Sequence, residues 1–428
     1  MEIYQISFIL FQTFMIPVIF FSLIFYFVSI GSLFIKNPKF RFKLKKFKWP
    51  FVTIQIPVYN DPVAARCIET CMKLDYPKNR YEVIVADDST DEKTREILDK
   101  YAKKYPIKLI RRGNRKGFKA GALNNALKYS KGEIVTVFDA DFVPPKNFLK
   151  EVVKPFLVDE RIAIVQTRMG FLNYDQNIIT RFAASLLAAY HHCWLPLFNK
   201  VNSVFFCGTH GAIRRSVLEE VGGWNEENLT EDADLSVKIL DKGYKNIYLS
   251  DMKVPGEVPF TLSGFIKQQS RWVYGQTQTF MGNWKRILFS KTLKLSQKLS
   301  IFFVTFGGIT APFVIGMTFF GQVALFTAPP KPVGFIDMLN FVKNFIITMG
   351  FLFMIWVAVF LKKGVISTKK MKVWKLMLSS IPLGLYLAFF NMIAFFKGIF
   401  GVPMIWHLTP KWGSISILEK FKSLFYWR

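Results

Sequence analysis

The stretch Ile134-Val135-Thr136-Val137-Phe138-Asp139-Ala140-Asp141 decides the fold of this chain. Its first five residues are β-branched or aromatic and predict a buried strand, and two aspartates follow within three positions. Open α/β sheets bind their ligands at the carboxyl ends of the strands. If the strand ends at Asp139, both carboxylates can turn toward one hard cation. Taken alone, such an acidic pair is more often a solvated turn, so the rest of the chain must decide.

Strand and helix patterns alternate around this stretch. Alternation of this kind is typical of a parallel sheet with helices on both faces. The expected strands are 52–56, 82–86, 107–111, 133–138 and 162–167, and the expected helices are 63–73, 92–104, 119–129 and 147–156. Polar residues follow the first, second and fourth strands, which is the edge where a ligand is expected.

A nucleotide at this edge would be held by side chains and a metal. Neither a Gly-x-x-x-x-Gly-Lys loop nor a Gly-x-Gly-x-x-Gly loop follows the first expected strand, which excludes the two commonest nucleotide-binding classes. Asp87 or Asp88 can accept a hydrogen bond from a base, and Tyr59 can stack on its ring. Lys119 can reach a phosphate. Residues 87–90 are equally suited to capping the next helix.

Two further polar segments lie downstream. Thr230-Glu231-Asp232 precedes an expected helix at 233–242, where Thr230 can act as the N-cap. A carboxylate at that place can alternatively take the proton from an attacking sugar hydroxyl. Gln268-Gln269-Ser270-Arg271-Trp272 offers a guanidinium for a phosphate and an indole for a sugar ring, or it belongs to an amphipathic helix at a membrane surface.

Hydrophobic segments flank this polar region. No charged residue occurs between positions 3 and 35, which exceeds the ~20 apolar residues that a membrane-spanning helix needs. Three more charge-free stretches are 299–330, 344–361 and 376–396. We therefore expect an N-terminal transmembrane helix at 1–36, a cytoplasmic domain at 50–285 with interfacial helices towards its end, a C-terminal membrane region with three hydrophobic segments at 299–400, and a basic tail at 401–428.

The formal net charge of +27 is explained by a membrane rather than by nucleic acid. Lysines and arginines cluster beside the hydrophobic segments, at 36–48, 285–298 and 362–375. Such clusters attract anionic headgroups and mark the cytoplasmic side, so we expect a multi-pass cell-membrane protein and no nucleic-acid partner. A full fourth span would place the basic tail outside, and Lys397 interrupts that segment. A re-entrant segment and an in-plane amphipathic helix are therefore alternatives to a span.

Four motifs occur in order between the membrane segments: Asp88, Asp139-x-Asp141, Thr230-Glu231-Asp232 and Gln268-x-x-Arg271-Trp272. Together they resemble the signature of processive family 2 glycosyltransferases, the group of cellulose, mannan, chitin and hyaluronan synthases. Phe205-Phe206-Cys207-Gly208-Thr209 also resembles the cellulose-synthase segment that contacts the growing end of the acceptor. The similarity runs from about residue 50 to 285. It implies a Rossmann-like GT-A fold of the α/β class with flanking transmembrane helices.

The resemblance also implies a site for a nucleotide-sugar donor, in which acidic and aromatic side chains hold the base and cationic ones contact the diphosphate. Its residues would be Tyr59, Asp87, Asp88, Lys119, Gln268 and Arg271. Mg²⁺ or Mn²⁺ would be anchored by Asp139 and Asp141, with Asp141 favoured as the direct ligand. The catalytic residues would be Glu231 and Asp232, with Asp232 as the general base. The acceptor platform would comprise Trp272, Cys207, Gly208 and Thr209.

One departure from the cellulose-synthase pattern narrows the resemblance. Those enzymes usually have His after the Asp-x-Asp triplet, whereas this chain has Phe142-Val143-Pro144. With residues 166–173 and the doubled Gln268-Gln269, this variant is closer to plant cellulose-synthase-like mannan synthases and their bacterial relatives.

The leading hypothesis is an inverting, metal-dependent transferase. It would move a hexose from UDP-glucose or GDP-mannose onto the 4-hydroxyl of a growing β-glycan, with the membrane segments as an exit channel. An alternative is transfer of one hexose to a membrane lipid, as in ceramide glucosyltransferases, which resemble this family. A non-catalytic membrane scaffold on the same fold is the third reading. The expected partners are the donor, a glycan or lipid acceptor and the bilayer, and partner subunits stay open.

Overall fold

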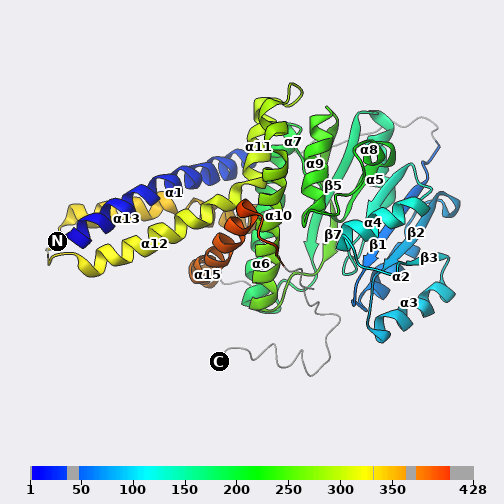
Figure 1. Cartoon of the computed structure of the whole chain (residues 1–428), viewed down its shortest axis with the longest axis horizontal. Coiled ribbons are helices and arrows are strands. Elements are labelled where there is room, and N and C mark those ends of the chain that lie inside the picture. The colour runs from blue at the N-terminus through cyan, green and yellow to red at the C-terminus, as the bar shows by residue number, and fades with distance from the viewer. Residues whose placement is uncertain (1, 36–47, 331, 363–372, 405–428) are drawn as a thin grey trace.

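A computed structural model of the chain describes residues 2–35, 48–330, 332–362 and 373–404. An α/β domain forms one end of the molecule, and long apolar helices extend from the other end (Figure 1). Two helices, α6 (Ile178–Ala189) and α10 (Leu262–Phe289), stand between them. The basic segments at 36–47 and 363–372, the tail from 405 and residue 331 lie outside the described residues.

A seven-stranded sheet forms the α/β domain. Its strands are β1 (Val52–Val58), β2 (Tyr81–Asp87), β3 (Ile107–Arg111), β4 (Ile134–Val137), β5 (Ile162–Phe171), β6 (Gly211–Arg214) and β7 (Lys245–Gly256). The order across the sheet is β3-β2-β1-β4-β6-β5-β7. The five strands expected from the sequence are all present.

The expectation of a purely parallel sheet is wrong, because β6 runs antiparallel to both β4 and β5. β6 has only four residues and begins with Gly211, so its sequence carries no recognisable strand pattern. β7 was not expected either. Its buried positions alternate with exposed ones that include Asp251 and Lys253, and it ends in Pro255-Gly256.

Helices cover both faces of the sheet. One face carries α2 (Ala64–Met72), α3 (Glu92–Lys104) and α5 (Phe148–Val158), with Phe138 packed against Phe148 at a ring distance of 4.9 Å. The other face carries α4 (Phe118–Tyr129), α8 (Arg215–Glu220) and α9 (Glu231–Asp241). The single turn η1 (Lys78–Arg80) precedes β2. The cap of α3 is Asp91, whose carboxylate accepts the Thr94 N–H, so capping by residues 87–90 is excluded.

Helices also form the apolar part of the molecule. They are α1 (Glu2–Phe34), the π-helical turn η2 (Tyr190–Trp194), α7 (Leu195–Lys200), α11 (Leu295–Thr305), η3 (Gly307–Ile309), α12 (Thr310–Thr327), α13 (Phe335–Thr348), α14 (Gly350–Trp356), η4 (Val357–Leu361) and α15 (Val373–Phe400). Within the described residues, α1, 307–327 and 375–400 are long and apolar enough to span a membrane. The pair 335–348 and 350–361 would make a fourth span and is bent by 57°.

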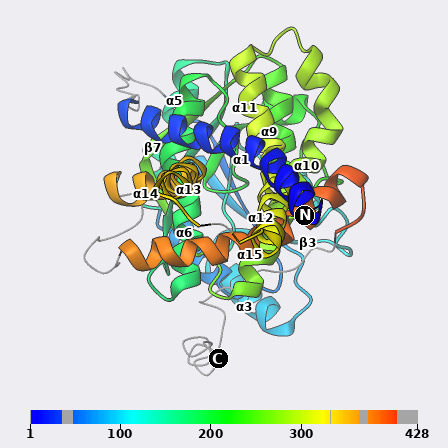
Figure 2. The ribbon, with the colours of Figure 1, turned by 90° about the vertical axis from the view of Figure 1, so that its left-hand side faces the viewer.

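The four apolar segments differ in direction. In Figure 2, α12 and α13 are seen nearly end-on, whereas α15 lies crosswise to them along its full length. α1 passes on the opposite side of α12 from α15 in the same view. The end of α15 is fixed at the level of η3, since Phe395 packs on Phe306 at a ring distance of 5.2 Å. α15 thus crosses α12 at that level, although its length and composition also suit a span.

Candidate active site

A cavity of about 460 Å³ opens at the carboxyl ends of the strands. Because β6 is antiparallel to its neighbours, its first residue lies at this edge too, so the loop before it enters the cavity. The cavity is lined by every site residue expected from the sequence except Asp87. These lining residues are Tyr59, Asp88, Lys119, Asp139, Asp141, Cys207, Gly208, Thr209, Glu231, Asp232, Gln268, Arg271 and Trp272.

The two adjacent aspartates after β2 have different surroundings. Asp87 is buried, pairs with Arg111 at 2.6 Å and accepts the Ser89 N–H, so it lies away from the cavity. Asp88 faces the cavity and forms a bidentate ion pair with Arg112. Nε of Arg112 donates to Oδ1 at 2.8 Å, and Nη2 donates to Oδ2 at 2.7 Å. A bidentate pair of this kind fixes the carboxylate in one orientation.

Arg115 is a cavity residue that the sequence did not single out. Its guanidinium lies 3.3 Å from the centre of the Tyr59 ring and 5.1 Å from that of Phe118. A cation stacked on an aromatic face is a stabilising contact. One face of Tyr59 is therefore covered, and a base that stacks there must use the other face or displace Arg115.

Asp139 and Asp141 follow β4 at the floor of the cavity. Asp139 Oδ1 pairs with Lys119 Nζ at 2.7 Å, and Asp141 Oδ2 accepts the Glu257 N–H at 2.8 Å. Carboxylate oxygens are the ligands preferred by Mg²⁺ and Mn²⁺. Among the described residues, no three His, Cys, Asp or Glu side chains converge on one point. The donor set thus fits a hard cation whose remaining ligands are water and phosphate oxygens.

Glu257, the residue after β7, contacts the Asp139–Asp141 loop through its backbone N–H, which donates to Asp141 Oδ2. It pairs with Arg66 at 2.8 Å, and Arg66 also donates to the backbone oxygen of Asp141 at 2.9 Å. Sequence reasoning missed both residues, because they contact the loop only after β7 and α2 have packed beside β4.

Glu231 and Asp232 begin α9. Gly208, with φ of +74°, approaches so closely that a Cβ there would lie 3.0 Å from Asp232 Oδ2. Burial raises the pKa of Glu231, and burial together with the charge of Glu231 raises the pKa of Asp232 to about 7. Asp232 is thus poised to exchange a proton near neutral pH. Thr230 does not cap α9 with its side chain, as one interpretation of the sequence held; its hydroxyl lies against Asn228 instead.

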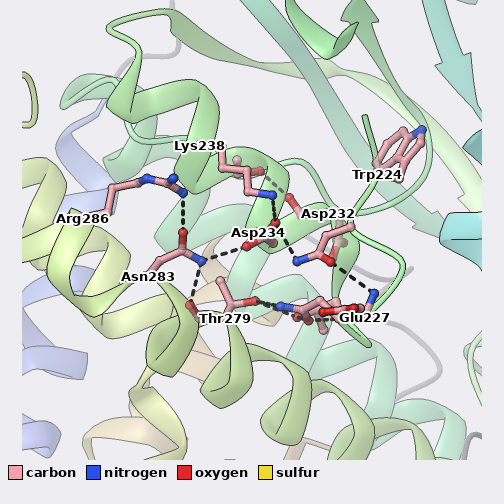
Figure 3. A network of polar contacts seen from close by, with 12 residues as sticks. Trp224, Glu227, Asp232, Asp234, Lys238, Thr279, Asn283 and Arg286 are labelled. Atoms are coloured by element: carbon pink, nitrogen blue, oxygen red, sulfur yellow. Dashed lines mark hydrogen bonds and ion pairs between the residues drawn. The ribbon is translucent and has the colours of Figure 1, made fainter. Parts of the chain in front are cut away.

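A polar network joins α9 to α10 (Figure 3). Asp234 accepts from Asn283 at 2.8 Å and pairs with Lys238 at 2.7 Å. Asn283 in turn accepts from Arg286 at 2.6 Å, and Thr279 accepts from Asn228 at 2.9 Å. These bonds hold the Thr-Glu-Asp segment against the helix that carries Gln268, Arg271 and Trp272.

The loop before β6 is tied to β5 by Gln166. The Gln166 side chain accepts the Cys207 N–H at 2.8 Å, and its amide nitrogen lies 2.9 Å from Nδ1 of His210. His210 also lines the cavity, and burial lowers its pKa to about 3, so its imidazole is neutral. The sequence analysis identified residues of this loop up to Thr209 and did not identify His210.

Comparisons with known proteins agree with this geometry. Residues 50–275 match the family model described as "Glycosyltransferase like family 2". A probable glucomannan 4-β-mannosyltransferase 11 of Oryza sativa subsp. japonica is 36% identical over 266 residues, which cover 60% of this chain and 46% of that protein. Glucomannan 4-β-mannosyltransferase 9 of Arabidopsis thaliana is 33% identical over 298 residues, covering 65% of this chain and 56% of the relative. The chain thus spans about half the length of these relatives.

A solved structure shares the fold. The mannosyltransferase PcManGT from Pyrobaculum calidifontis, in complex with GDP-Man and Mn²⁺, superposes with a TM-score of 0.63 at 18% identity. The match covers 94% of this chain and 100% of that one. At this identity the match establishes the GT-A architecture and its helical flank, and nothing about the substrate.

The Arg112–Asp88 pair generates a stability prediction. Arg112→Ala leaves a carboxylate that is 5% exposed without its bidentate partner and should lower the free energy of unfolding by about 2–4 kcal/mol. The matched control is Arg161→Ala, which removes a side chain that is 69% exposed and should cost less than about 1 kcal/mol. Thermal unfolding of the full chain in detergent compares the two. Equal destabilisation would show that Asp88 does not depend on Arg112.

Proposed function

Because the chain belongs to glycosyltransferase family 2, we propose that it transfers a hexose from a nucleotide sugar to the hydroxyl of a β-linked glycan, with inversion at the anomeric carbon. One observation carries the proposal. A carboxylate pair suited to a divalent cation, a lysine and an aspartate with a pKa of about 7 share one cavity. These are the groups that a displacement at a sugar–diphosphate bond needs.

Each group of residues in the cavity has a separate role in the transfer. Asp232 takes the proton of the acceptor hydroxyl, whose oxygen attacks the anomeric carbon as the bond to the diphosphate breaks. Lys119 and Arg271 stabilise the charge that develops on the departing diphosphate. A divalent cation at Asp139 and Asp141, Mg²⁺ or Mn²⁺, adds Lewis-acid stabilisation when bound.

The relatives support one choice of donor and product. They are named as glucomannan 4-β-mannosyltransferases, which favours GDP-mannose over UDP-glucose and a β-1,4 linkage. Trp272 lines the cavity beside the loop 205–209, and this pair suits the ring of an acceptor sugar. The apolar helices would then guide a growing chain out of the site.

A second candidate is transfer of one hexose to a membrane lipid. It is favoured by the wall of the cavity nearest the apolar helices, where Leu186 and Leu187 of α6 and Val304 of α11 are exposed to the cavity. An aliphatic acceptor would contact these side chains, whereas a glycan would place hydroxyl groups against side chains that cannot hydrogen-bond to them.

We also propose that the catalytic domain is cytoplasmic and that α15 lies in the plane of the membrane. Exposed apolar side chains recur along one face of α15 at Leu378, Tyr386, Phe389, Ile393 and Phe396. Such a stripe on a helix crosswise to α12 suits burial at the headgroup boundary. The basic tail then stays on the side of the catalytic domain, which agrees with the positive-inside rule.

The membrane arrangement is tested with a protease-sensitive tag placed after Arg428. The tag should resist protease added to intact spheroplasts of an expression host and be cleaved after lysis. A tag before Met1 is the control and should be cleaved in both conditions, because the proposed topology has that end outside. Cleavage of the C-terminal tag in intact spheroplasts would mean that α15 spans the bilayer.

The transfer itself is tested by a donor screen on the purified full chain. GDP-mannose and UDP-glucose are each supplied with Mn²⁺, with Mg²⁺ or with a chelator, and the product is analysed for linkage and size. We expect a β-1,4-linked glycan from GDP-mannose only when a metal is present. One hexose in an organic extract would favour the lipid acceptor, and no transfer from any donor would refute the proposal.

The role of Asp232 predicts a specific loss and a specific pH dependence. Asp232→Asn should lower kcat by at least ~100-fold while leaving nucleotide affinity intact. Since only the ionised carboxylate accepts a proton, the wild-type rate should fall as the pH drops below about 7 and level off above it. Asp241→Asn, on the same helix but outside the cavity, is the matched control. An unchanged rate for Asp232→Asn would refute the assignment.

A further inference from the structure

His210 occupies a strained place in the cavity wall. It directly follows the loop 205–209, and its φ of 43° lies in the left-handed region, which costs energy for a residue with a side chain. Its N–H donates to the Val137 carbonyl at 2.8 Å, which fixes it beside the end of β4. A strained backbone that survives at such a place points to a use for the side chain.

The hydrogen bonds of Gln166 determine which ring nitrogen of His210 carries the proton. Oε1 of Gln166 accepts the Cys207 N–H at 2.8 Å, so the amide nitrogen is the end that faces His210. That nitrogen lies 2.9 Å from Nδ1. The Thr167 hydroxyl also lies 3.2 Å from Nδ1, and because it donates to the His210 carbonyl, its oxygen could accept a proton from Nδ1. The Gln166 amide nitrogen is closer and can only donate, so a proton on Nδ1 would set two donors against each other at the shorter contact. We therefore take Nδ1 as the acceptor. The one proton of the neutral ring is therefore on Nε2.

Because the Gln166 and Thr167 contacts are at Nδ1 and His210 lines the cavity, we infer that Nε2 is the ring nitrogen that faces the cavity. The ring stacks on Phe142 with a centroid distance of 5.1 Å, and His191 lies behind it at 5.7 Å. Within the part of the chain that the structure describes, the hydrogen-bond contacts of the His210 ring are both made by Nδ1. The site therefore presents an oriented N–H donor that the protein itself does not use.

The position of this donor indicates which part of the substrate it meets. Phe142, under the ring, is the next residue after the expected metal ligand Asp141, and Gly208, two residues before His210, touches Asp232. A hexose in transfer must lie between these points, because its anomeric carbon is bonded to the diphosphate on one side and attacked on the other. A neutral N–H suits a sugar hydroxyl, whereas the diphosphate is met by the cationic Lys119 and Arg271.

We propose that Nε2–H of His210 donates a hydrogen bond to a hydroxyl of the transferred hexose and so helps to select the donor sugar. The inference rests on the proposed function and assigns to His210 the recognition of the transferred hexose within that site. A donor with a fixed proton rejects a hexose that lacks an oxygen at that place, because the N–H is then left unpaired.

Two substitutions distinguish the contribution of Nδ1 from that of Nε2. His210→Asn places an amide near Nδ1, tolerates the left-handed backbone and removes the donor at Nε2. His210→Gln places an amide near Nε2 and keeps a donor in the cavity. Each purified full-chain variant is assayed for transfer with the donor that wild type uses, for binding of GDP and UDP with Mn²⁺, and for thermal unfolding.

The expected results differ between the two variants. His210→Asn should unfold at the wild-type temperature, bind the nucleoside diphosphate as wild type does, and lose about 10- to 100-fold in kcat/KM for the nucleotide sugar. His210→Gln should recover part of that loss. If His210 had only a structural role, His210→Asn would preserve activity better than His210→Gln. Higher activity of His210→Gln would therefore indicate a contact between the Nε2 donor and the sugar.

Three outcomes would overturn the inference. Wild-type kcat/KM in His210→Asn would show that the hexose does not need the Nε2 donor. An equal loss of affinity for the nucleoside diphosphate would place the contact on the phosphates instead. If wild type transfers no hexose from any donor, the proposed function fails, and the inference fails with it; an active wild type with an unaffected His210→Asn refutes the inference alone.

Discussion

The ammonium group of Lys119 is the interaction on which the site depends. Its Nζ lies 2.7 Å from Asp139 Oδ1 and 3.9 Å from Glu231 Oε1, and it donates to the Gly208 carbonyl at 2.8 Å. It therefore joins the end of β4, the start of α9 and the loop before β6. Burial opposes the charge of Lys119, but Asp139 and Glu231 outweigh this effect, and the pKa of Lys119 is raised. Without that cation, the carboxylates would repel one another in a partly buried cavity.

The same site is supported from the membrane side. Asp234 and Asn283 bind α9 to α10, so the candidate base and the helix with Arg271 and Trp272 form one unit (Figure 3). Because α10 also packs along α15, this unit is in direct contact with the apolar helices. The close contact of Gly398 with Thr277, where a Cβ would lie 2.8 Å away, shows how tightly the two helices meet.

Local patterns predicted more of the site than of the sheet. The strand before Asp139, the acidic start of α9 and the Gln-x-x-Arg-Trp helix each have a recognisable sequence, and the structure brings all three to one cavity. β6 was not predicted, because four residues beginning with Gly211 are too few to show the alternation of buried and exposed side chains that marks a strand. The expected caps at residues 87–90 and at Thr230 were wrong, because Asp91 and Asn228 make the competing hydrogen bonds.

The sequence by itself determined the class of fold, the hydrophobic segments and the identity of the charged groups, since these depend on periodicity and on side-chain chemistry. Only the tertiary structure decided that β6 is antiparallel, that Asp87 turns away from the cavity while Asp88 faces it, and that α15 lies crosswise. It also decided the partners of Glu257 and His210, which come from strands far apart in the chain. Such contacts depend on register and packing between elements, and no local pattern of residues encodes them.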